Sequence, residues 1–164
     1  MDTQHHKQTD FIIRRATLDN ALGIAMLLHD LGWSDRIAAE KPNETADRIG
    51  RHLALCQADD SHSVYVAETD EAEIVGYVSV HWLPYLIHLG PEGFISELFV
   101  KSSFRGRRIG SRLLATVEAE AEQRGCARLG LINNRERESY HRQFYKKQGW
   151  EERDWAANFV KWLM

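Results

Sequence analysis

The hydrophobic positions of this chain alternate between a period of two and a period of three to four. Short runs with a period of two predict β-strands, and apolar residues at i, i+3 and i+4 predict helices that bury one face. Strands are predicted at 11–16, 64–67, 74–80, 94–100, 127–132, 150–154 and 158–163. Helices are predicted from Thr17 or Asp19 to Gly32, from Asn43 or Thr45 to before Asp59, from Arg108 to Gly125 and from Arg135 to Gln148, and residues 33–42 read as a loop with weak helical character.

This order of elements predicts an α/β (α+β) fold with one mixed sheet of six to seven strands, mostly antiparallel, flanked by four helices. Asp70 and Glu71 separate two strand patterns and indicate an antiparallel hairpin. The helix between strands 94–100 and 127–132 is long enough to return the chain for a parallel pairing with a right-handed crossover. No internal repeat or low-complexity linker divides the chain, so residues 10–164 are predicted to form a single domain.

Composition and charge indicate a globular protein of one domain and argue against a membrane-spanning one. The 164 residues suit one domain, and a formal net charge of −3 is too small to imply a partner. Residues 1–9 are polar and are expected to form a disordered or tag-like arm. No window holds the roughly 18 apolar residues of a membrane span, and the N-terminus lacks a signal-peptide core. We therefore expect a cytoplasmic protein without a membrane partner.

Cysteine and histidine spacing bears on disulfides and metals. Cys56 and Cys126 are the chain's two cysteines, which argues against a disulfide framework and fits a reducing cytosol. The eight histidines show no spacing typical of metal ligands. The sequence therefore predicts no metal.

A basic turn that contains glycines joins the strand 94–100 to the following helix. It reads Lys-Ser-Ser-Phe-Arg-Gly-Arg-Arg-Ile-Gly-Ser over residues 101–111. The first turn of a helix leaves backbone N–H groups without internal acceptors and carries partial positive charge. Glycines let a phosphate approach the backbone, and arginines add charge-assisted donors. The turn is therefore a candidate cradle for a diphosphate, with a solvated charged loop as the alternative interpretation.

Two segments of the chain resemble motifs of the GNAT superfamily of acyl-CoA-dependent N-acetyltransferases. Residues 104–110 are similar to the family's acetyl-CoA motif, Arg/Gln-x-x-Gly-x-Gly/Ala, with Arg105 in the first position and Gly110 in the last. Arg108 replaces the middle glycine, and we expect a helical φ there, so that its backbone N–H can serve. Residues 144–150 are similar to the family's Phe-Tyr-x-x-x-Gly-Phe signature, and the agreement in element order extends over about residues 10–164.

The resemblance implies an enzyme that transfers the acetyl group of acetyl-CoA to a primary amine by direct attack within a ternary complex. The pantetheine arm would pair with the backbone of Phe99 and Val100, and backbone amides of the turn would hold the pyrophosphate. Glu138 stands seven positions before Tyr145, where the family often has an asparagine. Residues expected to contact the coenzyme are Leu98, Phe99, Val100, Arg105, Gly106, Arg107, Arg108, Ile109, Gly110, Ser111 and Asn134.

Acetyl transfer to an amine needs a base for the ammonium proton and an acid for the departing thiolate. Glu97 is the candidate base because it lies in an otherwise apolar strand, where partial burial would raise its pKa. A satisfied structural carboxylate is the alternative, and Glu92 is a weaker candidate base. Tyr145 matches the family's tyrosine that protonates the thiolate, and a phenol with a pKa near 10 is available as a donor. The N–H of Phe99 or Val100 is a candidate oxyanion donor.

The acceptor is expected to be a small-molecule or peptide amine of unidentified structure. Trp33, Trp82 and Tyr85 are candidate pocket residues because loops beside a sheet opening carry specificity, although they are equally suited to anchor the loops. A homodimer is a further expectation.

Two other functions compete with catalysis. One is an acyl-CoA-binding regulatory module that transfers nothing. The other is a nucleic-acid-binding protein that uses the basic residues of 101–112, but the rest of the chain is net acidic and has no recognised binding motif. We therefore predict that nucleic acid is not a partner.

Overall fold

The computed structural model describes residues 10–32 and 34–163. The chain has two compact units, residues 1–131 and 132–164, and each is described by itself. The prediction of a single domain over 10–164 therefore stays a prediction. The first unit contains β1 (Phe11–Arg15), the 3-10 helix η1 (Leu18–Asn20), α1 (Ala21–Leu31), α2 (Asp35–Ala39), α3 (Pro42–Gln57), β2 (His62–Thr69), β3 (Ile74–Leu83), β4 (Glu92–Val100), the 3-10 helix η2 (Ser102–Phe104), α4 (Ile109–Gln123) and β5 (Arg128–Leu131).

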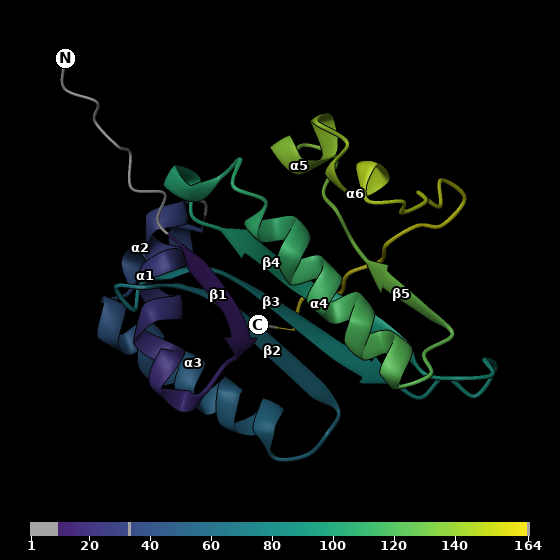
Figure 1. Ribbon diagram of the computed structural model, residues 1–164, viewed down its shortest axis with the longest axis horizontal. Helices are drawn as coiled ribbons and strands as arrows, with labels where there is room; N and C mark the ends of the chain where they lie inside the picture. Colours follow the sequence, from purple (N-terminus) through teal and green to yellow (C-terminus); the bar gives the residue numbers. More distant parts are fainter. Residues whose placement is uncertain (1–9, 33, 164) are drawn as a thin grey trace. The chain divides into compact units, whose positions relative to one another are not determined.

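One mixed sheet runs through the first unit in the order β1-β2-β3-β4-β5 (Figure 1). The first four strands are antiparallel, and β5 pairs with β4 in parallel after the crossover through α4. The hairpin predicted around Asp70 and the parallel pairing are confirmed. The mixed sheet with flanking helices confirms the predicted fold class.

Helices cover both faces of this sheet. A Cβ added to Gly76 of β3 would lie within 3.3 Å of Ile109 and Leu113, so α4 packs closely on that face. The next residue, Tyr77, faces the opposite side and belongs to a buried cluster supplied by α1, α3 and the sheet. Because successive side chains of a strand point to opposite faces, this pair fixes the orientation of the neighbouring residues.

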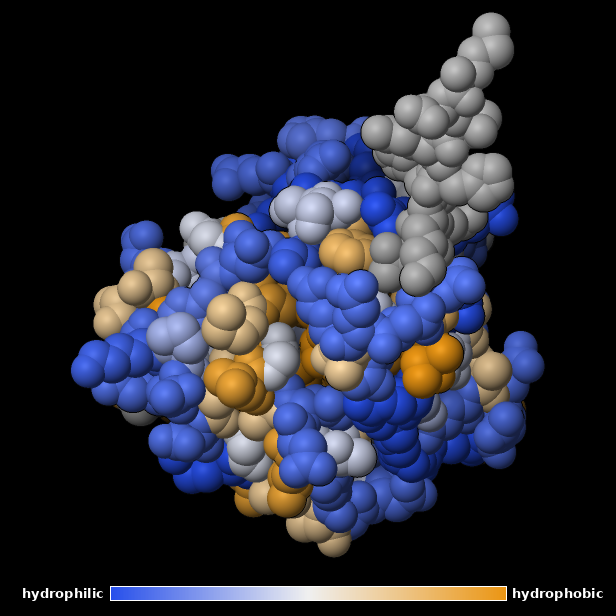
Figure 2. All heavy atoms as spheres, turned by 60° about the vertical axis from the view of Figure 1, so that its left-hand side comes forward, coloured by the Kyte–Doolittle hydropathy of each residue, from blue (hydrophilic) through white to orange (hydrophobic). Residues whose placement is uncertain are grey.

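The predicted helices of the first unit are confirmed because their apolar periodicity matches a buried face. Along α4, the side chains at Ile109, Leu113, Leu114 and Val117 are each at most 1% exposed. The helix stops before Gly125, whose φ of 64° is left-handed. Seen from the side of α1, α2 and α3, apolar side chains lie in small groups among hydrophilic ones (Figure 2).

The second unit corrects one predicted helix. The helix expected at 135–148 is two short helices, α5 (Glu138–His141) and α6 (Phe144–Lys147). Gln143 has φ of 55° and ψ of 41° between them, and a left-handed residue interrupts the helical hydrogen-bond pattern. The sequence carries neither Gly nor Pro at this break, so periodicity alone predicted one continuous helix.

The two strands expected at 150–154 and 158–163 are wrong, and the sheet has five strands among the described residues rather than six to seven. Every residue from 151 to 163 is exposed, and large apolar side chains such as Trp155 and Phe159 are 78% and 91% exposed. Aromatic and β-branched residues favour strands only where a neighbouring strand accepts their backbone hydrogen bonds. In the described residues this segment has no such neighbour.

Candidate active site

The backbone after β4 makes a tight turn before α4 begins. The Phe104 N–H donates to the Lys101 carbonyl at 2.9 Å and closes η2. Gly106 has φ of 78°, and Arg108 has φ of 61° with ψ of 14°. The helical φ expected at Arg108 is therefore wrong. The chain must change direction from extended Arg105 into the helix, and a left-handed residue at the helix entry makes that change.

The start of α4 presents backbone donors that the helix itself does not use. The Arg112 N–H donates to the Arg108 carbonyl at 3.0 Å, the first bond of the helical pattern. The N–H groups of Ile109, Gly110 and Ser111 precede that bond, so they have no acceptor within the helix. The Ile109 side chain is 1% exposed and fixes this end of the helix to the sheet. Residues 105–108 beside it are exposed.

Four arginines, at 105, 107, 108 and 112, surround these donors, and all are exposed. The Arg107 guanidinium lies 4.8 Å from the centre of the Phe104 ring, and that of Arg112 lies 4.3 Å from the centre of the Phe11 ring. Aromatic contacts of this kind orient a guanidinium without neutralising it. Together with the helix dipole, the arginines make this end of α4 attractive to a phosphate.

On the side of β4 that faces β5, only the first part of the strand has a hydrogen-bonded neighbour. The parallel register between β4 and β5 runs from Glu92 with Arg128 to Ile95 with Leu131 and stops there. The end of β4, through Leu98 to Val100, continues its pairing with β3 on the other side. β5 therefore does not accompany β4 over its last residues (Figure 1).

A β-bulge in β4 sets the direction of Glu97. Ser79 of β3 is opposite Glu97, while the next residue, Val80, is opposite Ile95, so Ser96 is the extra residue. A bulge re-aims the side chains next to it. The extra residue places Glu97 on the same face as Ser79, and period-two alternation then places Phe99 there with Tyr77.

The surroundings of Glu97 favour its protonated form. The residue is exposed, yet its carboxyl is close to enough protein for the loss of solvation to raise its pKa. A hydrogen bond with the Tyr77 hydroxyl and the charge of His52 act in the opposite direction and lower that pKa. Glu97 also raises the pKa of the Cys56 thiol, second to the effect of burial. A carboxylate with a raised pKa that still reaches solvent is suited to accept a proton.

The other candidate base, Glu92, is held in an ion pair. Its side chain is 5% exposed, and its Oε2 lies 2.5 Å from an Arg128 guanidinium nitrogen and 3.9 Å from His88 Nε2. The space around it is tight, because a Cβ on Gly130 would lie 2.8 Å from Glu92 Oε1. Glu92 is thus engaged in joining β4 to β5, which accounts for a buried carboxylate without a catalytic role.

The segment that carries this geometry matches a known protein family in sequence. Residues 26–150, which include the basic turn and Glu97, match the sequence pattern of the Acetyltransferase (GNAT) family. The chain belongs to the GNAT family. The resemblance inferred from residues 104–110 and 144–150 is thereby confirmed, and so is the expectation of an N-acetyltransferase at the level of the family.

Individual proteins are similar to this chain in sequence or in fold. An aminoalkylphosphonate N-acetyltransferase of Salmonella typhimurium strain LT2 is 41% identical over 80 residues, which are 49% of this chain and 51% of that protein. The match thus spans about half the length of this curated relative. The crystal structure of a transcriptional regulator from Bacillus halodurans C-125 has a TM-score of 0.77 and 25% identity, covering 94% of this chain and all of that one. An aminoglycoside N-acetyltransferase in complex with CoA shares the fold, with a TM-score of 0.73, 18% identity and coverage of 97% and 99%.

The second unit carries the GNAT residues expected at 134 and 145. Burial raises the pKa of Tyr145 to about 12, and its ring contacts those of Phe144 and Trp150, with centroids 5.0 Å and 5.9 Å away. Asn134 is exposed, and its side-chain oxygen accepts the Glu136 N–H at 2.9 Å. Tyr145 remains protonated through the neutral range, and the roles of both residues stay predictions.

The residues expected to contact the acceptor lie in different environments. Trp33 lies outside the described residues. Trp82 is 6% exposed, donates its indole N–H to Ser63 Oγ at 3.0 Å and packs under the Arg124 guanidinium, so it offers little surface to a ligand. Tyr85 is 45% exposed and lies in the loop before β4, with its ring 5.5 Å from that of His88. Of the two described residues, Tyr85 exposes more of its side chain to solvent, and a role in acceptor binding stays a prediction for all three.

Sequence reasoning missed Tyr77 and the bulge at Ser96. Tyr77 looked like one more apolar residue of a core strand. Two consecutive polar residues, Ser96 and Glu97, within an otherwise apolar strand were the available signal for the bulge. A strict alternation cannot hold across such a pair without burying one of them.

Further expectations concern metals, cysteines and the membrane. No group of three or more potential metal-ligating side chains lies together in the described part of the chain. Cys56 and Cys126 are both free thiols. Among residues 10–32 and 34–163, every helix is too short or too polar to cross a membrane. The absence of a metal, the homodimer and the cytoplasmic location stay predictions.

Proposed function

We propose that this GNAT protein transfers the acetyl group of acetyl-CoA to a primary amine by direct attack within a ternary complex. The observation that carries the proposal is the segment 105–112, where four exposed arginines lie beside a helix N-terminus whose first N–H groups have no acceptor within the helix, in a chain that matches the GNAT family. Anionic diphosphate fits this donor set, because each of these features favours negative charge.

Acetyl-CoA would be held along β4 and at the start of α4. The backbone amides of residues 105–111 would hold its diphosphate, with the arginines as additional donors. The pantetheine arm would run along the end of β4, where β5 no longer accompanies that strand. A backbone N–H of Phe99 or Val100 would donate to the carbonyl oxygen as negative charge develops there.

Glu97 would accept the proton of the attacking amine. A primary amine with a pKa of about 10 is mainly an ammonium ion at neutral pH and cannot attack in that form. Once deprotonated, the amine nitrogen forms a bond to the thioester carbon, and the carbon–sulfur bond then breaks. Tyr145 would donate the proton that the departing thiolate takes up, since its hydroxyl stays protonated below a pKa of about 12.

We propose an aminoalkylphosphonate as the first class of acceptor to test. The support is the 41% identity with the Salmonella aminoalkylphosphonate N-acetyltransferase over half of the chain. Release of free thiol from acetyl-CoA should be measured with aminomethylphosphonate and 1-aminoethylphosphonate, against glycine and alanine as matched carboxylates. Faster release with the phosphonates supports this acceptor class.

Other outcomes of the same assay discriminate among the alternatives. Turnover with a different amine of the panel retains the acetyltransferase and rejects the phosphonate class. If calorimetry detects acetyl-CoA binding but no amine releases thiol, the protein is a non-catalytic coenzyme-binding module. Salt-sensitive binding of duplex DNA without acetyl-CoA binding would reject the proposal altogether.

A further inference from the structure

The bulge in β4 brings two residues from different strands onto one face of the sheet. Tyr77 of β3 is directly opposite Phe99 of β4, and their ring centroids are 5.7 Å apart. Glu97 lies two positions before Phe99 and is therefore the diagonal neighbour of Tyr77. Diagonal neighbours on one face of a sheet are within reach of a long aromatic side chain. Without the bulge, regular alternation through Ile95, Ser96 and Glu97 would turn Glu97 to the α4 face, where Ile95 lies.

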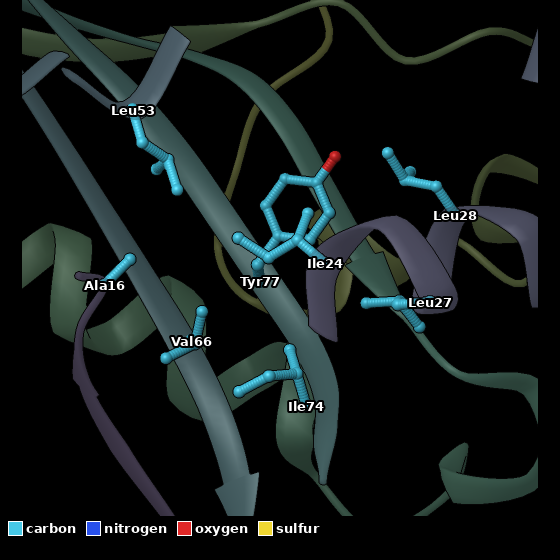
Figure 3. Close-up of a cluster of buried hydrophobic side chains, with 8 residues drawn as sticks. All are labelled: Ala16, Ile24, Leu27, Leu28, Leu53, Val66, Ile74 and Tyr77. Atoms are coloured by element: carbon cyan, nitrogen blue, oxygen red, sulfur yellow. The ribbon is translucent and has the colours of Figure 1, made fainter. Parts of the chain in front are cut away.

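Tyr77 is an unusual member of the buried cluster. Its ring packs among aliphatic side chains of α1, α3 and the sheet, and the residue is 3% exposed. Figure 3 shows its hydroxyl as the one oxygen among the eight labelled side chains, pointing away from Val66 and Ile74. Burying a hydroxyl is costly unless it makes a hydrogen bond. Glu97, its diagonal neighbour, is the group that acts on this hydroxyl, because after burial it is the main cause of the raised pKa of Tyr77.

The remaining titratable groups near Glu97 come from α3. His52 and Cys56 are four residues apart and so lie on one side of that helix. The charge of His52 favours the ionised carboxylate, while the Cys56 thiol has a raised pKa. Neither is fixed in the core as the Tyr77 ring is, because His52 is exposed and Cys56 is half-buried. Tyr77 is thus the group near Glu97 whose donor has a position set by packing.

We propose that Tyr77 is a positioning residue for Glu97: its buried hydroxyl donates a hydrogen bond to the Glu97 carboxylate and holds that base in one orientation for the acceptor amine. This inference rests on the proposed function, because it assigns a role in the same acetyl transfer. The bond also stabilises the ionised carboxylate, which is the form that accepts a proton. Without this bond, the loss of solvation would raise the pKa of Glu97 further.

The Tyr77→Phe variant tests this role because it removes one oxygen and retains the ring in the core. The pKa of Glu97 should rise by about one unit, as expected for the loss of a hydrogen bond to the charged form. The acidic limb of the kcat/KM profile should move upward by the same amount. Carboxyl NMR titration of Glu97 gives a second reading that does not depend on turnover.

Tyr65→Phe is the matched control. The Tyr65 hydroxyl also donates to a carboxylate, Glu120 Oε2 at 2.8 Å. The control variant therefore loses a bond of the same chemical kind away from Glu97, and thermal melts compare the stability of the two variants. Tyr65→Phe should leave both the Glu97 titration and the acidic limb where the wild-type protein has them.

The design separates failure of this inference from failure of the proposed function. An upward shift of titration and limb in Tyr77→Phe but not in Tyr65→Phe, with no further change when Tyr77→Phe is added to Glu97→Gln, supports the role. If Glu97→Gln loses the limb while Tyr77→Phe matches the wild type, Tyr77 only packs and the inference is overturned. If Glu97→Gln keeps the limb, Glu97 is not the base, and both the base assignment and the role of Tyr77 fall, whereas thiol release still reports on acetyl transfer itself.

Discussion

Arg108 combines a glycine-like backbone with a charged side chain, and two substitutions separate these properties. Its φ of 61° is left-handed, which costs a residue with a Cβ about 1–2 kcal/mol. Arg108→Gly removes this strain together with the guanidinium. Arg108→Ala removes the guanidinium and keeps the strain.

The difference in unfolding free energy between the two variants measures the backbone strain at residue 108. Alanine at a position with positive φ is less stable than glycine, even though glycine has more conformational freedom in the unfolded chain. We expect Arg108→Gly to exceed Arg108→Ala in unfolding free energy by about 1 kcal/mol. For a chain of this length, that corresponds to roughly 2–4 °C in Tm. Acetyl-CoA affinity should stay within about fivefold of wild type in Arg108→Gly, the range of an exposed charge pair.

Urea unfolding and calorimetric titration with acetyl-CoA measure these two quantities. Ala72 is the matched control, because its φ is also 61° and it lies in the β2–β3 turn. Ala72→Gly should give a similar gain in stability and leave coenzyme affinity unchanged. Equal stability of the two Arg108 variants would refute the argument from strain, and a loss of affinity well beyond tenfold in both would show that the guanidinium itself holds the coenzyme.

Three further variants test the chemistry and the ion pair. Tyr145→Phe should lower kcat by at least about tenfold with acetyl-CoA affinity nearly unchanged, as for loss of a general acid; unchanged turnover would remove Tyr145 from the mechanism. Glu97→Gln should abolish the acidic limb of kcat/KM, which in the wild type should lie above the ordinary glutamate pKa of about 4.3. Because folding raises the pKa of Glu97, its contribution to stability is present at low pH and declines as pH rises through the folded pKa. Glu97→Gln should therefore gain stability relative to wild type as the pH rises above the ordinary glutamate pKa of about 4.3 in thermal melts, and a constant difference would contradict the raised pKa. Arg128→Met removes the guanidinium partner of the buried Glu92 carboxylate and should cost about 3 kcal/mol in urea unfolding, and a neutral effect would show that the ion pair is dispensable.

Local patterns in the sequence predicted the elements whose stability is set by one buried face. The apolar repeat from Ile109 to Val117 predicted α4 correctly, and Asp70 and Glu71 marked the β2–β3 hairpin. The prediction of two C-terminal strands was wrong because a strand needs a neighbouring strand to pair with. Residues 150–163 include aromatic and β-branched residues, but they have no such neighbour in the described structure. The break between α5 and α6 at Gln143 was not predicted, because no glycine or proline marks it in the sequence.

The candidate site was predictable only in part. The motif at residues 104–110 identified the turn proposed to hold the diphosphate, but the left-handed φ of Arg108 follows from the path between β4 and α4 and not from the residue type. Glu97 was found as a polar residue in an apolar strand. Its partner Tyr77 was not, because their proximity depends on cross-strand register and on the extra residue Ser96.

The central claim is that the first turn of α4 holds the diphosphate of acetyl-CoA, and a calorimetric titration of Ser111→Asp with acetyl-CoA tests it most directly. An aspartate at this position interacts favourably with the helix dipole, so the fold should persist. Its negative charge repels a diphosphate, so the affinity for acetyl-CoA should fall by at least about tenfold. Ala119→Asp adds the same charge about 12 Å further along α4 and should bind acetyl-CoA as the wild type does. Wild-type affinity in Ser111→Asp, or no binding heat in the wild-type protein, would contradict the account.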